Sequence, residues 1–478
     1  MKDRSPFFAA CCFAATLSLA IAGCDSSESR AREAFSAYQA ASAAGDPGAA
    51  RVALLQLVAA EDGNPSYWEE LGKVQIELGA FADAYYAFTR AHELDRSNAQ
   101  VLSNLTQLSL LSGSIDIAED HAHKLELLVP DHPAVKLTYG YVALRRQNLD
   151  EAERQSDQLL QAFPLESSAK LLKARILVAR GQHNEAIELL RAQLRAAPDD
   201  SGSWKALKAM HERDGNWPEV AVAARRLASL NPKDTESSLA AVDAAFRSKD
   251  IAAALRASEP FLKPDSPPSQ VDSVLTVWAD RWKSPQAVEE ARRLARSAGP
   301  RQVLAYATYF NAAGSPDDAA TLLGGGAPQL PVTLANTSVN AVIAETLALR
   351  GQKAEAKRLF DAILAKEPDH VYALRGRINL EIRTGAAKAA INDAQRLVSI
   401  LPRSARDRLL LVRAYAAAGD RRQVDRTLWD AFHEIPANIM LYEALRAHVQ
   451  RTGGPESASR IDAEFQQQQD VVLAREFI

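Results

Sequence analysis

Proline recurs along this chain at multiples of 34 residues. The prolines that keep this interval are Pro130, Pro164, Pro198, Pro232, Pro300, Pro368, Pro402 and Pro436. Glycines recur in the same register, half a period away, at Gly45, Gly79, Gly181, Gly215, Gly351, Gly385, Gly419 and Gly453. A period of this length predicts a stack of similar units, each too small to bury its hydrophobic face alone.

Each half-period has room for one helix. Glycine ends the first helix because it enters the left-handed conformation without a Cβ clash. Proline ends the second helix because it lacks an N–H group and clashes with the preceding turn. Helices of about a dozen residues are marginal alone in water, so the pairs must stack. The units are predicted to start near residues 31, 65, 99, 133, 167, 201, 235, 269, 303, 337, 371, 405 and 439.

The unit resembles the tetratricopeptide repeat. The copy that begins at residue 65 carries Trp68, Leu71 and Gly72 in its first helix and Ala84 and Phe88 in its second. A small residue recurs where the second helix crosses the first, as Ala50, Ala84, Ala118, Ala152, Ala186, Ala254, Ala356 and Ala390. The resemblance implies an all-α fold, an α-solenoid of about 12 helix–turn–helix units in a right-handed superhelix.

The N-terminus is typical of an exported lipoprotein. Lys2 and Arg4 precede an apolar run over 6–22, and small residues lead to Cys24, the pattern of a secretory signal. The sequence from Ile21 to Cys24 resembles the lipobox of bacterial lipoproteins. That resemblance implies removal of residues 1–23, lipid on Cys24 and a tether over 24–30. The alternative is an uncleaved anchor helix.

The repeats divide into blocks of different regularity. We expect an N-terminal block over 31–258, degenerate units with Pro/Gly-rich loops over 259–336, a C-terminal block over 337–438 and capping helices over 439–478. The middle is either part of a continuous solenoid, bent or loosened there, or a flexible hinge between two rigid blocks.

The sequence offers little catalytic chemistry. The three cysteines all lie within the first 24 residues, so no disulfide framework is expected. His121 and His123 stand two apart on a helix and point in different directions, so they do not form a metal pair. The net charge of −4 gives no electrostatic basis for binding nucleic acid. We expect no enzyme activity, no cofactor and no metal.

Two surfaces are candidates for binding. In tetratricopeptide repeats, residues 2, 5, 9 and 12 of each unit often face a ligand. Carried onto this chain, this places Arg375, Asn379, Arg406 and Arg413 in a basic strip suited to an acidic peptide or an anionic polysaccharide; the alternative is ordinary solvated arginines.

Tyr141 and Leu144 suggest a second, apolar groove in the early repeats. The alternative is that these two residues belong to the core between repeats.

These observations predict a lipid-anchored scaffold on the periplasmic face of the bacterial cell envelope, in the inner or outer membrane. Its partners would be other envelope proteins bound in the groove. Lipid-anchored repeat proteins of this length resemble those of exopolysaccharide export and exosortase-type systems more than the shorter pilus factors. The alternative is a carrier that binds an anionic polysaccharide directly.

Overall fold

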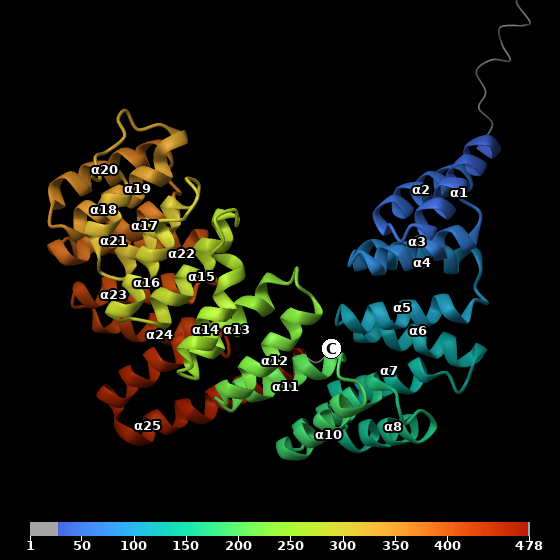
Figure 1. Ribbon diagram of the computed structural model, residues 1–478. Helices are drawn as coiled ribbons and strands as arrows, with labels where there is room; N and C mark the ends of the chain where they lie inside the picture. Colours follow the sequence, from blue (N-terminus) through green and yellow to red (C-terminus); the bar gives the residue numbers. More distant parts are fainter. Residues whose placement is uncertain (1–26, 477–478) are drawn as a thin grey trace, which may run out of the picture. The chain divides into compact units, whose positions relative to one another are not determined.

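The computed structural model describes residues 27–476, and over this range the chain is all α-helical (Figure 1). The predicted signal peptide and Cys24 lie outside the described residues, so lipid attachment stays a prediction. No helix of residues 27–476 combines the length and the apolar character needed to cross a membrane.

The helices fall into two compact units that divide within α9. Unit 1 contains α1 (Ser27–Ala43), α2 (Pro47–Ala60), α3 (Pro65–Glu77), α4 (Phe81–Leu94), α5 (Ala99–Leu111), α6 (Ile115–Leu128), α7 (Pro133–Arg145), α8 (Leu149–Ala162) and most of α9 (Ser167–Ala179). Consecutive helices in it pack against one another, as expected for stacked antiparallel pairs.

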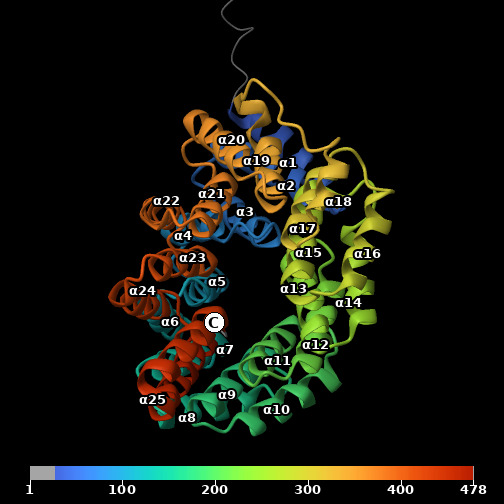
Figure 2. The ribbon, with the colours of Figure 1, turned by 90° about the vertical axis from the view of Figure 1, so that its left-hand side faces the viewer.

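Unit 2 begins at Leu177 and holds the remaining helices. They are α10 (His183–Ala196), α11 (Ser201–Arg213), α12 (Trp217–Leu230), α13 (Thr235–Arg247), α14 (Ile251–Ser258), α15 (Pro268–Arg281), α16 (Pro285–Ala295), α17 (Val303–Ala312), α18 (Pro316–Leu322), α19 (Thr337–Leu349), α20 (Lys353–Lys366), α21 (Val371–Thr384), α22 (Ala387–Ile400), α23 (Ala405–Ala417), α24 (Arg421–Glu434) and α25 (Ile439–Glu476). Two short 3-10 helices, η1 (Glu259–Phe261) and η2 (Leu334–Asn336), lie between them. Figure 2 shows α15, α17, α19, α21 and α23 on the inner side of this unit and their even-numbered partners outside.

The 34-residue period sets the helix boundaries. First helices begin at residues 65, 99, 133, 167, 201, 235, 303, 337, 371, 405 and 439, as predicted from the sequence. The predicted all-α solenoid of paired helices is therefore confirmed. Units in the middle are shorter: α14 has eight residues and α18 has seven.

Alanine at the helix crossing lets the two backbones of a pair approach closely. All eight alanines identified at this position are buried, with at most 2 % of their surface exposed. An aromatic ring also packs directly against the helix backbone at a glycine: a Cβ on Gly72 would lie only 2.7 Å from the ring of Phe88. The pair is thus held by side chains that fit only at short interhelical distance.

The irregular repeats over 259–336 have a packed hydrophobic core. One hydrophobic cluster runs from α13 to α19 and includes the fully buried Trp278, whose indole N–H donates to Ser258 Oγ at 2.9 Å. The loop before α19 is pinned by Asn340, whose amide group exchanges two hydrogen bonds with the backbone of Gln329, at 2.8 and 2.9 Å. Residues 259–336 all lie within unit 2.

The last helix, α25, is bent and continues the repeat. Gly454 adopts non-helical angles (φ 79°, ψ −176°), and the chain after it folds back on the first half. The ring of Phe465 stacks on that of Tyr442 at a centroid distance of 4.1 Å. α25 also contacts α11 near the start of unit 2, where Arg213 Nε lies 2.8 Å from the side-chain amide oxygen of Gln466.

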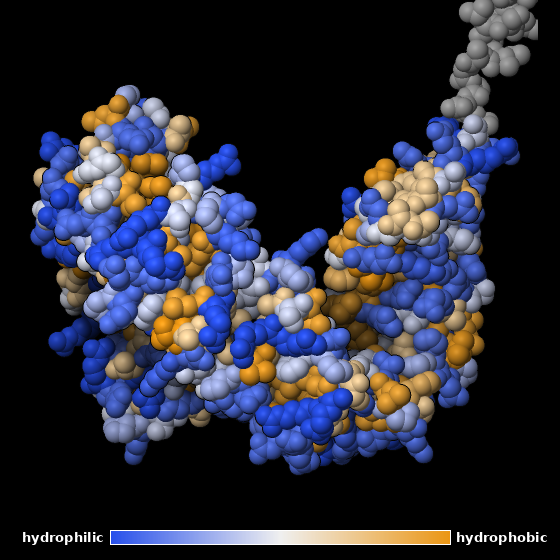
Figure 3. Space-filling model, in the orientation of Figure 1, coloured by the Kyte–Doolittle hydropathy of each residue, from blue (hydrophilic) through white to orange (hydrophobic). Residues whose placement is uncertain are grey.

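On the face shown in Figure 3, hydrophilic side chains alternate with smaller groups of hydrophobic side chains on both units. The most exposed large ones are Leu127, Leu165, Leu330 and Leu334, at 69 to 81 % exposure. They lie at the ends of second helices or in the loop before α19, not at helix crossings.

Two turns of the solenoid lack the glycine that their backbone favours. Gln147 and Lys249 have φ values of 60° and 62°, matching the positive φ of Gly181 and Gly215, which stand one period away. Left-handed backbone is costly for residues with a Cβ. We therefore predict that Gln147→Gly and Lys249→Gly each stabilise the chain by about 0.5–1 kcal/mol, measured by urea unfolding. Gly181→Gln is the matched control and should destabilise it; loss of stability in both glycine variants would contradict the prediction.

Candidate functional site

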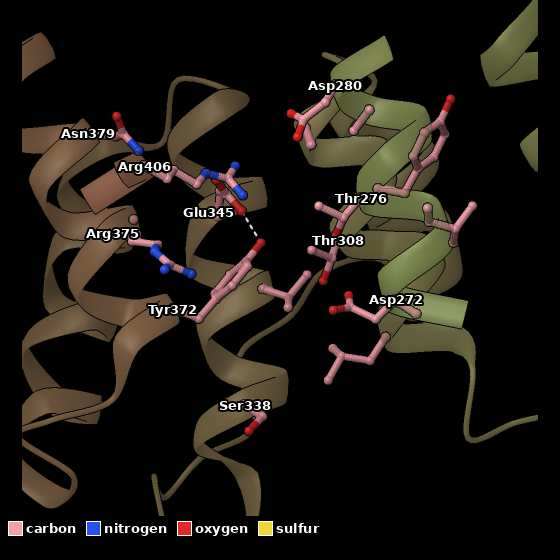
Figure 4. A pocket seen from close by; sticks show the side chains of 18 of the residues that line it. Asp272, Thr276, Asp280, Thr308, Ser338, Glu345, Tyr372, Arg375, Asn379 and Arg406 are labelled. Carbon is pink, nitrogen blue, oxygen red and sulfur yellow. Dashed lines mark hydrogen bonds between the residues drawn. The ribbon is translucent and has the colours of Figure 1, made fainter. Parts of the chain in front are cut away.

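A groove of about 760 Å³ lies on the inner side of unit 2. Its walls come from the first helices α15, α17, α19, α21 and α23, so residues from five consecutive units meet there (Figure 4). A concavity of this size lined by several elements is a usual place for a ligand.

The structure brings Arg375, Asn379, Arg406 and Arg413 together on the α21 and α23 side of this groove. The period places them there, because equivalent positions of neighbouring first helices stack side by side. Arg406 and Arg413 are exposed, and neither has an ion-pair partner among the side chains of residues 27–469. Their role in binding stays a prediction.

Arg375 differs from the other two arginines because it is committed to a partner. Its Nε and Nη2 both donate to the carboxylate of Asp407, at 2.7 Å each, and the Asp407 side chain is 0 % exposed. A bidentate pair with a buried carboxylate holds α21 to α23. Sequence reasoning missed Asp407, although it lies close to one repeat period after Arg375.

Carboxylates face the arginines from the opposite side. Asp272 and Asp280 stand two turns apart on α15 with Thr276 between them, and Thr308 joins them from α17. In Figure 4 both carboxylates extend into the groove toward the arginine side. Enclosure by the groove raises the pKa of Asp272, while Arg406 acts to lower it. Their i, i+4 and i+8 spacing was a visible signal, but it falls in the least regular repeats.

Glu345 and Tyr372 occupy the space between the two walls. The Tyr372 hydroxyl donates a hydrogen bond to Glu345 Oε2 (Figure 4). Burial raises the pKa of Glu345, although Tyr372 and Arg406 act to lower it. Burial and the neighbouring Glu345 hold the pKa of Tyr372 well above its usual value.

The groove therefore carries charges of both signs, not a purely basic strip. The charged residues lining it are Asp272, Asp280, Glu345 and Asp407, against Lys283, Arg301, Arg375, Arg406 and Arg413. The predicted basic strip corresponds only to the wall formed by α21 and α23. What the arrangement can do is pair with groups of either charge, and hydrogen-bond through Thr276, Thr308 and Asn379.

Tyr141 and Leu144 belong to the packed interior of unit 1. Tyr141 is 8 % exposed, and Leu144 packs against the same cluster, which joins α5 to α9. The Arg175 guanidinium lies 5.1 Å from the centre of the Tyr141 ring. Their position fits the alternative that they form core between repeats.

The wall formed by α21 is braced from behind by a second group of charges. Arg377 donates to Asp393 at 2.6 and 2.8 Å and to Asp361 at 2.9 Å, which links α20, α21 and α22. Glu381 is buried beside this network. Burial, together with Asp393, raises its pKa to about 7.

The first prediction from the site separates structural from solvated arginines. Arg375→Ala leaves the buried carboxylate of Asp407 unpaired, so we expect a loss of about 3–5 kcal/mol of unfolding free energy. Arg413→Ala, on the same wall, should change stability by less than about 0.5 kcal/mol. Urea unfolding of the two variants measures the difference, and equal losses would refute this assignment.

The stability of the folded chain should also depend on pH through Glu381. Because the folded state raises the pKa of Glu381 from 4.5 to about 7, it binds the proton more tightly than the unfolded state. Stability from this group is therefore complete below pH 4.5 and declines as the pH rises to 7, by up to about 3 kcal/mol. Glu381→Gln should match the original protein in acid and exceed its stability at pH 8. An advantage that is independent of pH would argue against the assignment.

Among the side chains of residues 27–469, no group of three or more His, Cys, Asp or Glu residues is arranged to hold a metal ion.

Two segments of the chain match known family models. Residues 143–210 and 343–405 match two family models, each described as tetratricopeptide repeat. Cellulose synthase operon protein C of Salmonella typhimurium is 26 % identical over 243 residues, which are 50 % of this chain. The matched region spans only 17 % of that protein's length.

Parts of two solved structures also match this chain. The type IV pilus biogenesis factor PilW matches 41 % of this chain and 91 % of its own, with 17 % identity and a TM-score of 0.33. The PilF protein of Pseudomonas aeruginosa matches 42 % of this chain and 93 % of its own, with 16 % identity and a TM-score of 0.31.

Proposed function

We propose that this chain, two segments of which match tetratricopeptide repeat models, serves as a scaffold that binds other proteins in the cell envelope, within a system that assembles or exports an exopolysaccharide. The observation that carries the proposal is the groove of unit 2, to which five consecutive first helices contribute. A surface built from several repeats can hold an extended or helical segment of a partner.

The envelope location draws on the sequence. The charged, apolar and small-residue pattern over 1–23, followed by Cys24, supports export and lipid attachment. More than one acyl chain at that cysteine would hold the protein firmly at a membrane. The similarity to a protein of a cellulose synthase operon supports the link with polysaccharide systems.

A second candidate function is direct binding of an anionic polysaccharide. Arg406 and Arg413 favour it, because both are exposed and free to pair with carboxylates. Asp272 and Asp280 oppose it, because a polyanion in the groove would approach both of them. Like-charge contacts of this kind are costly, so we rank a protein partner first.

Site-specific photo-crosslinking in the intact envelope tests the scaffold proposal. A photoreactive amino acid at position 413 faces the groove, whereas the same amino acid at position 422, on α24, does not line it. We expect defined protein adducts from position 413, identified by mass spectrometry as components of polymer synthesis or export. Adducts that are the same from both positions, or carbohydrate adducts only, would reject it.

Lipid attachment at Cys24 can be tested separately from partner binding. Cys24→Ser removes the predicted lipid acceptor, so the variant should leave the membrane fraction and appear in the soluble fraction of broken cells. The distribution is read by immunoblot against the original protein. An unchanged membrane fraction would count against lipid anchoring and favour the alternative of an uncleaved helix.

A further inference from the structure

Two aspartates on one wall of the groove face two arginines on the other without pairing with them, and Lys283 and Arg301, next to the ends of α15 and α17, also line the groove. Arg406 and Arg413 project from α23, and Asp272 and Asp280 project from α15. All four are exposed, and within the described part of the chain none of them has a hydrogen-bond or ion-pair partner. Figure 4 shows Arg406 facing the two carboxylates across open space.

From this arrangement we infer that the groove receives a polypeptide segment that has acidic side chains along one side and basic side chains along the other. The acidic side would pair with Arg406 and Arg413, and the basic side with Asp272 and Asp280. The inference rests on the proposed function, that the groove binds a protein, and it specifies the chemistry of that protein's docking segment.

Binding of a ligand in the groove changes the solvation of its charged residues. A ligand removes water from all four charges at once, and each charge left without a partner then costs free energy. A uniformly acidic segment would satisfy the arginines and be repelled by the aspartates. A uniformly basic segment would pair with the aspartates and be repelled by the arginines. Only a segment with both signs in the matching order satisfies both walls, so the walls also exclude wrong partners.

The floor of the groove suits a polypeptide as well. Apolar side chains such as Leu304, Val342 and Leu409 also line the groove and can cover the aliphatic parts of the segment.

Peptide display on the detergent-purified full-length chain tests the inference. A library of random short peptides is selected for binding, and the enriched sequences are read for charge. We expect enriched peptides to carry both acidic and basic residues at a preferred spacing. Enrichment of purely acidic peptides, of uncharged peptides, or of none would overturn the inference.

Charge reversal of each wall sharpens the test. Arg406→Glu should weaken capture of the selected peptides about tenfold, and Asp280→Lys should shift selection toward purely acidic peptides. The double variant with both changes should again select peptides of mixed charge. Arg422→Glu, an exposed change on α24 outside the groove, is the matched control and should leave selection unchanged. Equal effects of Arg422→Glu and Arg406→Glu would also overturn the inference.

The result is separable from the proposed function. Crosslinking in the envelope reports whether a protein occupies the groove in the cell, whatever its charges. Mixed-charge selection without envelope adducts would reject the scaffold proposal alone. Envelope adducts from a protein whose crosslinked segment bears one sign of charge would reject the inference alone.

Discussion

Close packing of two helices at a small residue is the contact on which this protein depends. A single helix of 13 or 14 residues is marginal in water, and the pair gains stability only when its backbones approach closely. Alanine at the crossing permits that approach, and the aromatic ring of Phe88 seated on Gly72 fills the remaining space. Each pair then needs its neighbours, so stability spreads along the chain by local contacts.

The same dependence explains how much could be predicted from the sequence. Helix boundaries followed the 34-residue period because turn residues act locally: a glycine or proline marks its turn wherever the helix pair lies. Arg375, Asn379, Arg406 and Arg413 were found because equivalent positions stack. Asp272 and Asp280 were not, since they lie in the part of the chain whose repeats match the pattern least well, although α15 itself begins within one residue of its predicted start. Asp407 was missed because its burial depends on how one unit sits on the next, which the sequence pattern does not give.

The groove illustrates how a repeat can build a specific site from ordinary residues. One arginine, Arg375, is used to join two units, while its neighbour Arg406 remains free at the surface. The difference arises from a single buried aspartate. Opposite charges on facing walls then give the site a preference that neither wall has alone, because a ligand must match both of them when water leaves.

The bent last helix gives unit 2 a contact between helices that are far apart in the chain. In a stack of helix pairs, each pair usually contacts only its two neighbours. In unit 2, α25 reaches back to α11, and Gln466 lies within hydrogen-bonding distance of Arg213. The contact between α25 and α11 therefore closes a ring of helix contacts that runs from α11 through α12, α13, α15, α17, α19, α21 and α23 to α25.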